Sequence, residues 1–163
     1  MNREKSIEIL NKAIGEELLA VDQYMYFHFV CDDRGYSPLA AIFKKLAIVE
    51  MIHVEKLAER VFFLKGDVIM KRPAGAEQIK EPEAMLKKAK ELEQMSIDHY
   101  NQWARDLADN LDSVSKKLVE SINVEEEDHF DIFDTEDDNI KDFGDNYLAL
   151  QAIDHSRKMG ERG

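Results

Sequence analysis

Six residues with metal-binding side chains interrupt faces of the chain that are otherwise apolar. They are four glutamates and two histidines: Glu17, Glu50, His53, Glu93, Glu126 and His129. Each lies at helical spacing between hydrophobic residues, as Glu17 does between Ile14 and Val21. A carboxylate buried without a partner is strongly unfavourable, and four of them together would repel one another. Divalent cations would turn that repulsion into binding, so the pattern predicts a metal centre.

The positions of these residues repeat along the chain. In each half of the sequence, the two glutamates are 33 residues apart, and a shift of 76 residues superimposes one half on the other. The shift pairs Glu17 with Glu93, Glu50 with Glu126 and His53 with His129. It also pairs hydrophobic positions, for example Leu46 with Ile122. The repeat predicts two similar helical hairpins that face each other and contribute one half each to a nearly symmetric site.

Each histidine belongs to a Glu-x-x-His motif, which places both side chains on one side of a helix. Six ligands of this kind suit two metal ions. We predict that Glu50 and Glu126 bridge the two metal ions. One further glutamate and one histidine complete the coordination of each ion, Glu17 and His53 for the first and Glu93 and His129 for the second. Such ligands accept iron, manganese or zinc. Redox chemistry favours iron, because two Fe²⁺ ions can together give two electrons to O₂ or H₂O₂.

Long helices must position these side chains. The chain has 163 residues with only three prolines and seven glycines, and its apolar residues follow a period of 3.6. We predict long helices over residues 3–32, 37–66, 82–109 and 112–143, and a short one over 146–157. The irregular segment 66–81 is long enough to cross the length of a bundle. The expected fold is all-α, a four-helix bundle with a long central crossover and a short fifth C-terminal helix, in a single domain over residues 1–163.

Composition excludes several classes of protein. The net charge of −12 disfavours binding to nucleic acid, because phosphates would be repelled. The single cysteine, Cys31, excludes a disulfide or a CxxC metal site within the chain. No apolar segment approaches the length of a membrane span, and the first residues lack the apolar region of a secretion signal. We therefore expect a soluble cytoplasmic protein that binds no membrane.

The sequence resembles the bacterioferritins over nearly its whole length. The matching segments are Gly15-Glu16-Glu17-Leu18, Asp22-Gln23-Tyr24, Glu50-Met51-Ile52-His53, Glu59-Arg60-Val61-Phe62-Phe63-Leu64, Glu93 and Glu125-Glu126-Glu127-Asp128-His129. The resemblance implies a ferritin-like bundle with two Fe ions per subunit at the six residues above, and places Tyr24 beside them. It implies a ferroxidase that oxidises Fe²⁺ with O₂ or H₂O₂ and stores ferric mineral. It also implies a homo-oligomer, a cage of 24 subunits built from dimers, and a ferredoxin as electron donor.

Met51 points about 100° away from the metal-binding face of its helix. By spacing alone, a methionine there is an interface residue. The resemblance implies that it ligates a haem b or related iron porphyrin shared between two subunits. Some family members carry a histidine and an aspartate before this motif as an inner-surface iron site, where this chain has Lys45 and Val49. Because of this departure, the sequence does not predict the route of electrons between the mineral and the di-iron site.

Other classes of protein could carry the same metal-binding residues. A rubrerythrin-like peroxidase would share the site, but usually adds a domain with paired CxxC motifs. A mini-ferritin that protects DNA places its metals between subunits, whereas this chain carries a complete set of ligands. A substrate oxygenase would need an apolar pocket beside the metals, and a bundle with structural zinc would need no redox chemistry. We interpret the remaining histidines, His28, His99 and His155, as structural or surface residues, and Trp103 as a packing residue.

Overall fold

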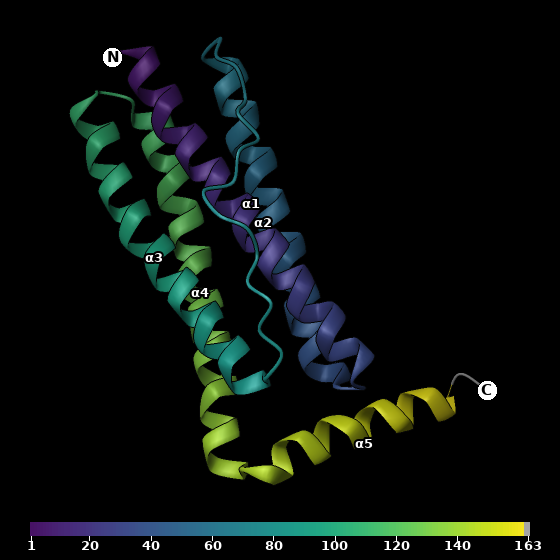
Figure 1. The fold of residues 1–163 in the computed structure, drawn as a ribbon. Helices are drawn as coiled ribbons and strands as arrows, with labels where there is room; N and C mark the ends of the chain where they lie inside the picture. The colour runs from purple at the N-terminus through teal and green to yellow at the C-terminus, as the bar shows by residue number, and fades with distance from the viewer. Residues whose placement is uncertain (162–163) are drawn as a thin grey trace.

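The computed structural model describes residues 1–161 and contains five helices within them. In chain order they are α1 (Arg3–Asp33), α2 (Ser37–Phe63), α3 (Pro82–Asp109), α4 (Ser113–Phe143) and α5 (Asp145–Glu161). The first four form a bundle, and α5 leaves its lower end at an angle (Figure 1). The all-α class, the four long helices and the short fifth helix are confirmed.

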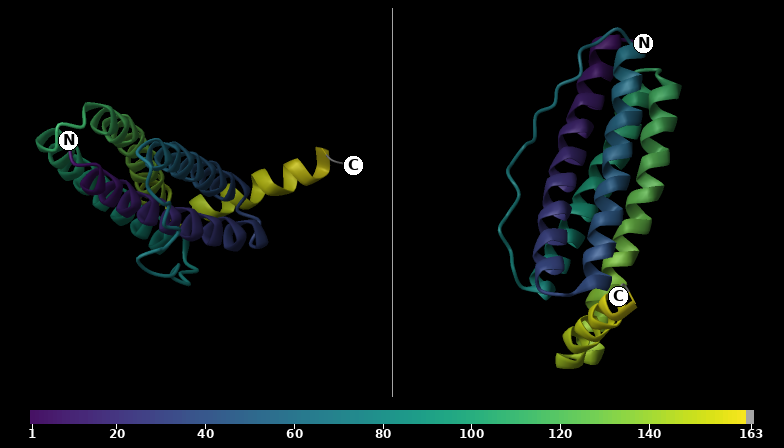
Figure 2. Two further views of the ribbon diagram at one scale, coloured as in Figure 1. Left: turned by 90° about the horizontal axis from the view of Figure 1, so that it is seen from above. Right: turned by 90° about the vertical axis from the view of Figure 1, so that its right-hand side faces the viewer.

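Two antiparallel hairpins make up the bundle. Helix α1 packs along α2, and α3 packs along α4, while a long connection runs the length of the bundle between α2 and α3 (Figures 1 and 2). Prolines in the first turns of α2 and α3 fix their starts, because proline has no amide hydrogen to leave unpaired there. The side chain of Asp112 caps α4 by accepting a hydrogen bond from the amide of Ser115. The predicted central crossover is therefore present.

Two helix ends differ from the sequence expectation. Helix α2 ends at Phe63 and does not reach Gly66, because Lys65 takes a left-handed conformation with φ 67°. The amide of Gly66 then donates to the carbonyl of Val61, which closes the helix. Helix α5 continues past residue 157 to Glu161, where Arg157 pairs with Glu161 at i,i+4 spacing.

The crossover is fixed to α1 by side chains that hydrogen bond to its backbone. The Gln23 amide accepts from the amide of Glu77 at 2.7 Å and donates to the carbonyl of the same residue at 2.9 Å. Further along α1, a Cβ atom at Gly15 would lie 2.7 Å from the carbonyl oxygen of Lys71. A glycine is therefore needed at this position, because a side chain would collide with the backbone of the crossover.

The hydrophobic core is divided by a layer of charged residues. One cluster is rich in aromatic rings and includes Tyr24, Phe27, Phe43 and Phe133. The other is mainly aliphatic and includes Leu10, Ile14, Leu57, Leu107 and Ile122. The six candidate metal ligands lie between the two clusters along all four helices of the bundle. The bundle thus surrounds a polar centre with apolar packing at both ends.

Helix α5 contacts the start of α2. The side-chain oxygen of Gln151 accepts a hydrogen bond from the amide of Leu39 at 2.9 Å, and a ring nitrogen of His155 lies 2.6 Å from the hydroxyl of Ser37. His155 is therefore a structural residue that docks the fifth helix. None of the helices within residues 1–161 is both long enough and apolar enough to cross a membrane.

Candidate metal centre

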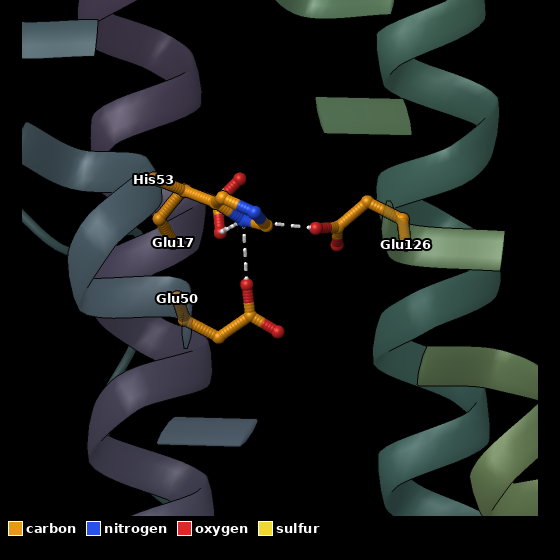
Figure 3. A group of neighbouring side chains, drawn as sticks. All are labelled: Glu17, Glu50, His53 and Glu126. Atoms are coloured by element: carbon orange, nitrogen blue, oxygen red, sulfur yellow. Dashed lines mark ion pairs between the residues drawn. The ribbon is translucent and has the colours of Figure 1, made fainter. Parts of the chain in front are cut away.

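The structure brings all six predicted ligand residues together in the middle of the bundle. They divide into two overlapping groups whose ligand atoms lie within 4.8 Å of one another. The first group is Glu17, Glu50, His53 and Glu126, and the second is Glu50, Glu93, Glu126 and His129. Figure 3 shows the first group, with its side chains converging from three helices. None of the six residues is more than 4% exposed.

Glu50 and Glu126 belong to both groups, which is the arrangement that bridging ligands require. Nδ1 of His53 lies 2.9 Å from Glu50 and 3.1 Å from Glu126. Nδ1 of His129 lies 2.9 Å from the other carboxylate oxygen of Glu50 and 4.0 Å from Glu126. The remaining glutamates lie one on each side, with Glu17 3.5 Å from His53 and Glu93 3.8 Å from His129.

These short distances join atoms that face a common centre without forming well-aligned hydrogen bonds. Six buried atoms of the cluster have no hydrogen-bond partner within residues 1–161: both oxygens of Glu50, one oxygen each of Glu93 and Glu126, and Nδ1 of His53 and of His129. Buried polar atoms are nearly always satisfied, so six in one place call for an unusual explanation. Two divalent cations would accept all six lone pairs, and the residues therefore fit a pair of metal ions.

The cluster has the electrostatics of a site built for positive charge. Burial raises the pKa of Glu50 well above its usual value, and the neighbouring charge of Glu126 raises it further. Burial and the charge of Glu50 act in the same way on the pKa of Glu93. Burial alone would lower the pKa of His53, but the carboxylates of Glu126, Glu17 and Glu50 outweigh it and raise this pKa. Bound cations would therefore compete with protons for the carboxylates of Glu50 and Glu93.

Two buried tyrosines hold the outer oxygens of the glutamates at the two ends. The hydroxyl of Tyr24 donates to Glu93, and the hydroxyl of Tyr100 donates to Glu17. Tyr24 therefore lies beside the site, as the resemblance implies. The sequence motifs did not predict a role for Tyr100 at the site, although the 76-residue repeat pairs it with Tyr24. The repeat is the signal that could have identified it.

Two further carboxylates contact histidines near the site. An oxygen of Glu125 lies 3.1 Å from Nε2 of His53, and the other oxygen accepts from Lys56 at 2.9 Å. A ring nitrogen of His99 lies 2.8 Å from Glu16, the neighbour of Glu17 in the chain. A metal-bound imidazole is usually oriented by a hydrogen-bond partner at its second ring nitrogen. Glu125 lies where it can orient the imidazole of His53 in this way.

Met51 lies outside the cluster on the outer face of α2, where its side chain is 55% exposed. Ile48 and Ile52 are also exposed on that helix. Met51 therefore points away from the six ligand residues, as its position in the motif predicts. Lys45 is exposed and Val49 is half-buried.

The fold and the centre define a ferritin-like four-helix bundle with a carboxylate and histidine cluster suited to metal ions. A family model described as a ferritin-like domain matches residues 7–143. A bacterioferritin of Desulfovibrio desulfuricans is 36% identical over 148 residues, covering 91% of this chain and 83% of that protein. A bacterioferritin of Brucella melitensis is 31% identical over 150 residues, covering 91% and 92% of the two chains.

The same relationship is found in three dimensions. A crystal structure of the Desulfovibrio desulfuricans bacterioferritin, described as showing its di-iron site in different catalytic states, superimposes with a TM-score of 0.90. It is 35% identical and covers 93% of this chain and 91% of that one. The chain belongs to the bacterioferritin family.

Proposed function

We propose that this protein stores iron and that its bundle is a ferroxidase, which oxidises Fe²⁺ to Fe³⁺ with O₂ or H₂O₂. Six buried atoms without hydrogen-bond partners among residues 1–161 support this proposal most directly, because they converge from α2, α3 and α4 on one centre. Glu17 and His53 would hold one iron ion, Glu93 and His129 the other, and Glu50 and Glu126 both. The bound pair of iron ions supplies two electrons to the oxidant.

The chain prepares this site in three ways. The apolar clusters above and below it exclude bulk water and hold the four helices in register. Tyr24 and Tyr100 fix the outer oxygens of Glu93 and Glu17, so that the inner oxygens remain directed at the metal ions. Burial raises the pKa values of Glu50 and Glu93, so iron would compete with protons for these carboxylates, which would balance the cationic charge.

Storage requires an assembly that encloses the oxidised product. We propose a 24-subunit cage built from dimers, on the basis of the bacterioferritin relatives. The exposed thioether of Met51, with Ile48 and Ile52 beside it, suits a haem b or related iron porphyrin held by one methionine from each subunit of a dimer. The haem would pass electrons from a donor such as a ferredoxin to the mineral.

Stopped-flow mixing of Fe²⁺ with O₂ tests the ferroxidase proposal. The native protein should show a fast oxidation phase that saturates at two Fe²⁺ per subunit. Glu126→Ala removes a bridging ligand and should abolish this phase while the helices remain folded by circular dichroism. Glu127→Ala, which changes an exposed neighbour, serves as the control and should oxidise Fe²⁺ normally. Native rates in Glu126→Ala would refute the assignment.

Size-exclusion chromatography, read at the protein and haem Soret wavelengths, tests the assembly. A cage-sized peak with Soret absorbance supports storage with haem. A cage without haem supports storage but removes the role of Met51. A monomer or dimer contradicts the cage and favours a soluble di-iron enzyme.

A further inference from the structure

The two ligand histidines are held differently. His53 faces the cluster through Nδ1, and its second ring nitrogen, Nε2, lies 3.1 Å from Glu125. Glu125 is itself held by Lys56, whose ammonium donates to the other carboxylate oxygen at 2.9 Å. The imidazole is thus fixed from behind by a carboxylate that is fixed in turn by a cation.

The repeat that relates the two halves of the site breaks at both of these supporting positions. A shift of 76 residues pairs Glu125 with Val49, and Lys56 with Ile132. Both counterparts are half-buried aliphatic residues, which offer neither a hydrogen-bond acceptor nor a charge. His129 also faces the cluster through Nδ1, at 2.9 Å from Glu50. Within residues 1–161, no side chain forms a hydrogen bond with its Nε2.

Two other features of the immediate surroundings keep the symmetry. Tyr24 donates to Glu93 on one side, and Tyr100 donates to Glu17 on the other. Both bridging carboxylates belong to both ligand groups. One clear difference between the halves therefore lies behind the two histidines, where only His53 has a side-chain partner among residues 1–161 that orients its imidazole ring.

A carboxylate behind a metal-bound imidazole fixes the tautomer and orientation of the ring and makes its nitrogen a better ligand. Loss of such a partner typically costs about 10–100-fold in metal affinity. Resting on the proposed two-metal site, we propose that its two positions are unequal. The ion beside Glu17 and His53 binds tightly, and the ion beside Glu93 and His129 binds weakly and exchanges readily.

Binding of Co²⁺ tests the order of filling without any oxidation of iron. Crystals of the metal-free protein are equilibrated with one Co²⁺ per subunit, and the metal is located by anomalous scattering. The two affinities are measured in solution by calorimetry. Co²⁺ should occupy mainly the position beside Glu17 and His53, and the two affinities should differ by about 10–100-fold.

Two reciprocal variants show whether the carboxylate behind the histidine causes the difference between the two metal affinities. Val49→Glu restores the missing partner and should raise the weaker affinity until both positions fill together. Glu125→Val removes the existing partner and should lower the stronger affinity by about 10–100-fold. Glu127→Val removes the same charge from an exposed neighbouring position and should change neither affinity. Val49→Gln, which adds an acceptor without charge, should raise the weaker affinity in part.

Equal occupancy of both positions in the native protein would overturn the inequality. A fall in both affinities together in Glu125→Val would overturn its cause, since that result indicates a general effect of charge. The ferroxidase proposal fails separately, if the protein binds Co²⁺ in the expected order but does not oxidise Fe²⁺. Failure to bind Co²⁺ at the six residues would contradict both proposals.

Discussion

The hydroxyl of Tyr100 on α3 donates a hydrogen bond to the carboxylate of Glu17 on α1, across the centre of the bundle. This bond joins the two hairpins directly at the metal-binding layer. It also occupies one oxygen of Glu17 and so determines which way the carboxylate turns. Tyr24 and Glu93 form the equivalent bond between the same two helices.

Tyr100→Phe should therefore weaken metal binding beside Glu17. A hydrogen bond to a charged group contributes about 1.5–3 kcal/mol, which corresponds to a loss of roughly 10–100-fold in affinity if the bond serves only the metal-bound state. Calorimetric titration with Co²⁺ measures the change. Tyr26→Phe, at a half-buried position that packs on Phe27, is the matched control and should bind normally. Unchanged affinity in Tyr100→Phe would show that the hydroxyl does not orient Glu17.

Trp103 offers an optical signal for the occupied site. It is the single tryptophan of the chain, and its ring meets Tyr100 edge-on at a centroid distance of 5.1 Å. A paramagnetic, coloured ion such as Co²⁺ should quench its fluorescence, whereas Zn²⁺, which has a filled d shell, should not. Equal emission with both ions would place the bound metal far from Trp103, and so away from the neighbouring Tyr100.

The stabilisation of the protein by metal should increase with pH. Burial is the main cause of the raised pKa values of Glu50, Glu93 and Glu126, so the metal-free native state binds more protons than the unfolded chain above about pH 4.5. These groups therefore lower the free energy of unfolding as pH rises. Metal ions displace the same protons, and their binding strengthens in the same direction.

Thermal unfolding with and without Zn²⁺, at about pH 5.5 and about pH 7.5, measures this linkage. The increase in Tm on adding Zn²⁺ should be larger at the higher pH. The pH effect should become smaller in Glu126→Ala, which lacks one of the titrating ligands. A gain in Tm independent of pH would mean that the carboxylates are already ionised before metal binds.

Met51→Leu should remove haem and leave Fe²⁺ oxidation intact. Leucine keeps the apolar volume on the outer face of α2 but has no thioether to ligate iron. Met70→Leu, at an exposed position in the crossover, controls for the loss of a methionine and should retain haem. The ratio of Soret to protein absorbance measures both. Native haem content in Met51→Leu would exclude this residue as the ligand.

The sequence predicted the bundle and the six converging residues because both depend on helical spacing. Glu17 and Glu93 stand out only because they occupy apolar faces. The apolar face of a helix follows from the spacing of its own residues and can be identified before the packing of the other helices is known. The starts of α2 and α3 were equally clear, since prolines mark them. The start of the irregular segment was less clear, because the left-handed turn at Lys65 carries no strong local signal.

Contacts that pass between helices were harder to predict. Glu125 is next to a ligand in the chain, but it contacts His53 on another helix, and this depends on how α4 packs against α2. The docking of α5 through Gln151 and His155 likewise depends on the angle at which that helix leaves the bundle. Periodicity gives the face of a helix but not the residue opposite it.

Anomalous scattering from crystals soaked with Fe²⁺ without oxygen tests the proposed di-iron centre most directly. Two iron peaks per subunit are expected at saturating Fe²⁺, both within bonding distance of Glu50 and Glu126. One should adjoin Glu17 and His53, and the other Glu93 and His129. Iron bound elsewhere, or no iron among these six residues at saturating Fe²⁺, would contradict the assignment of this cluster as the site of iron oxidation.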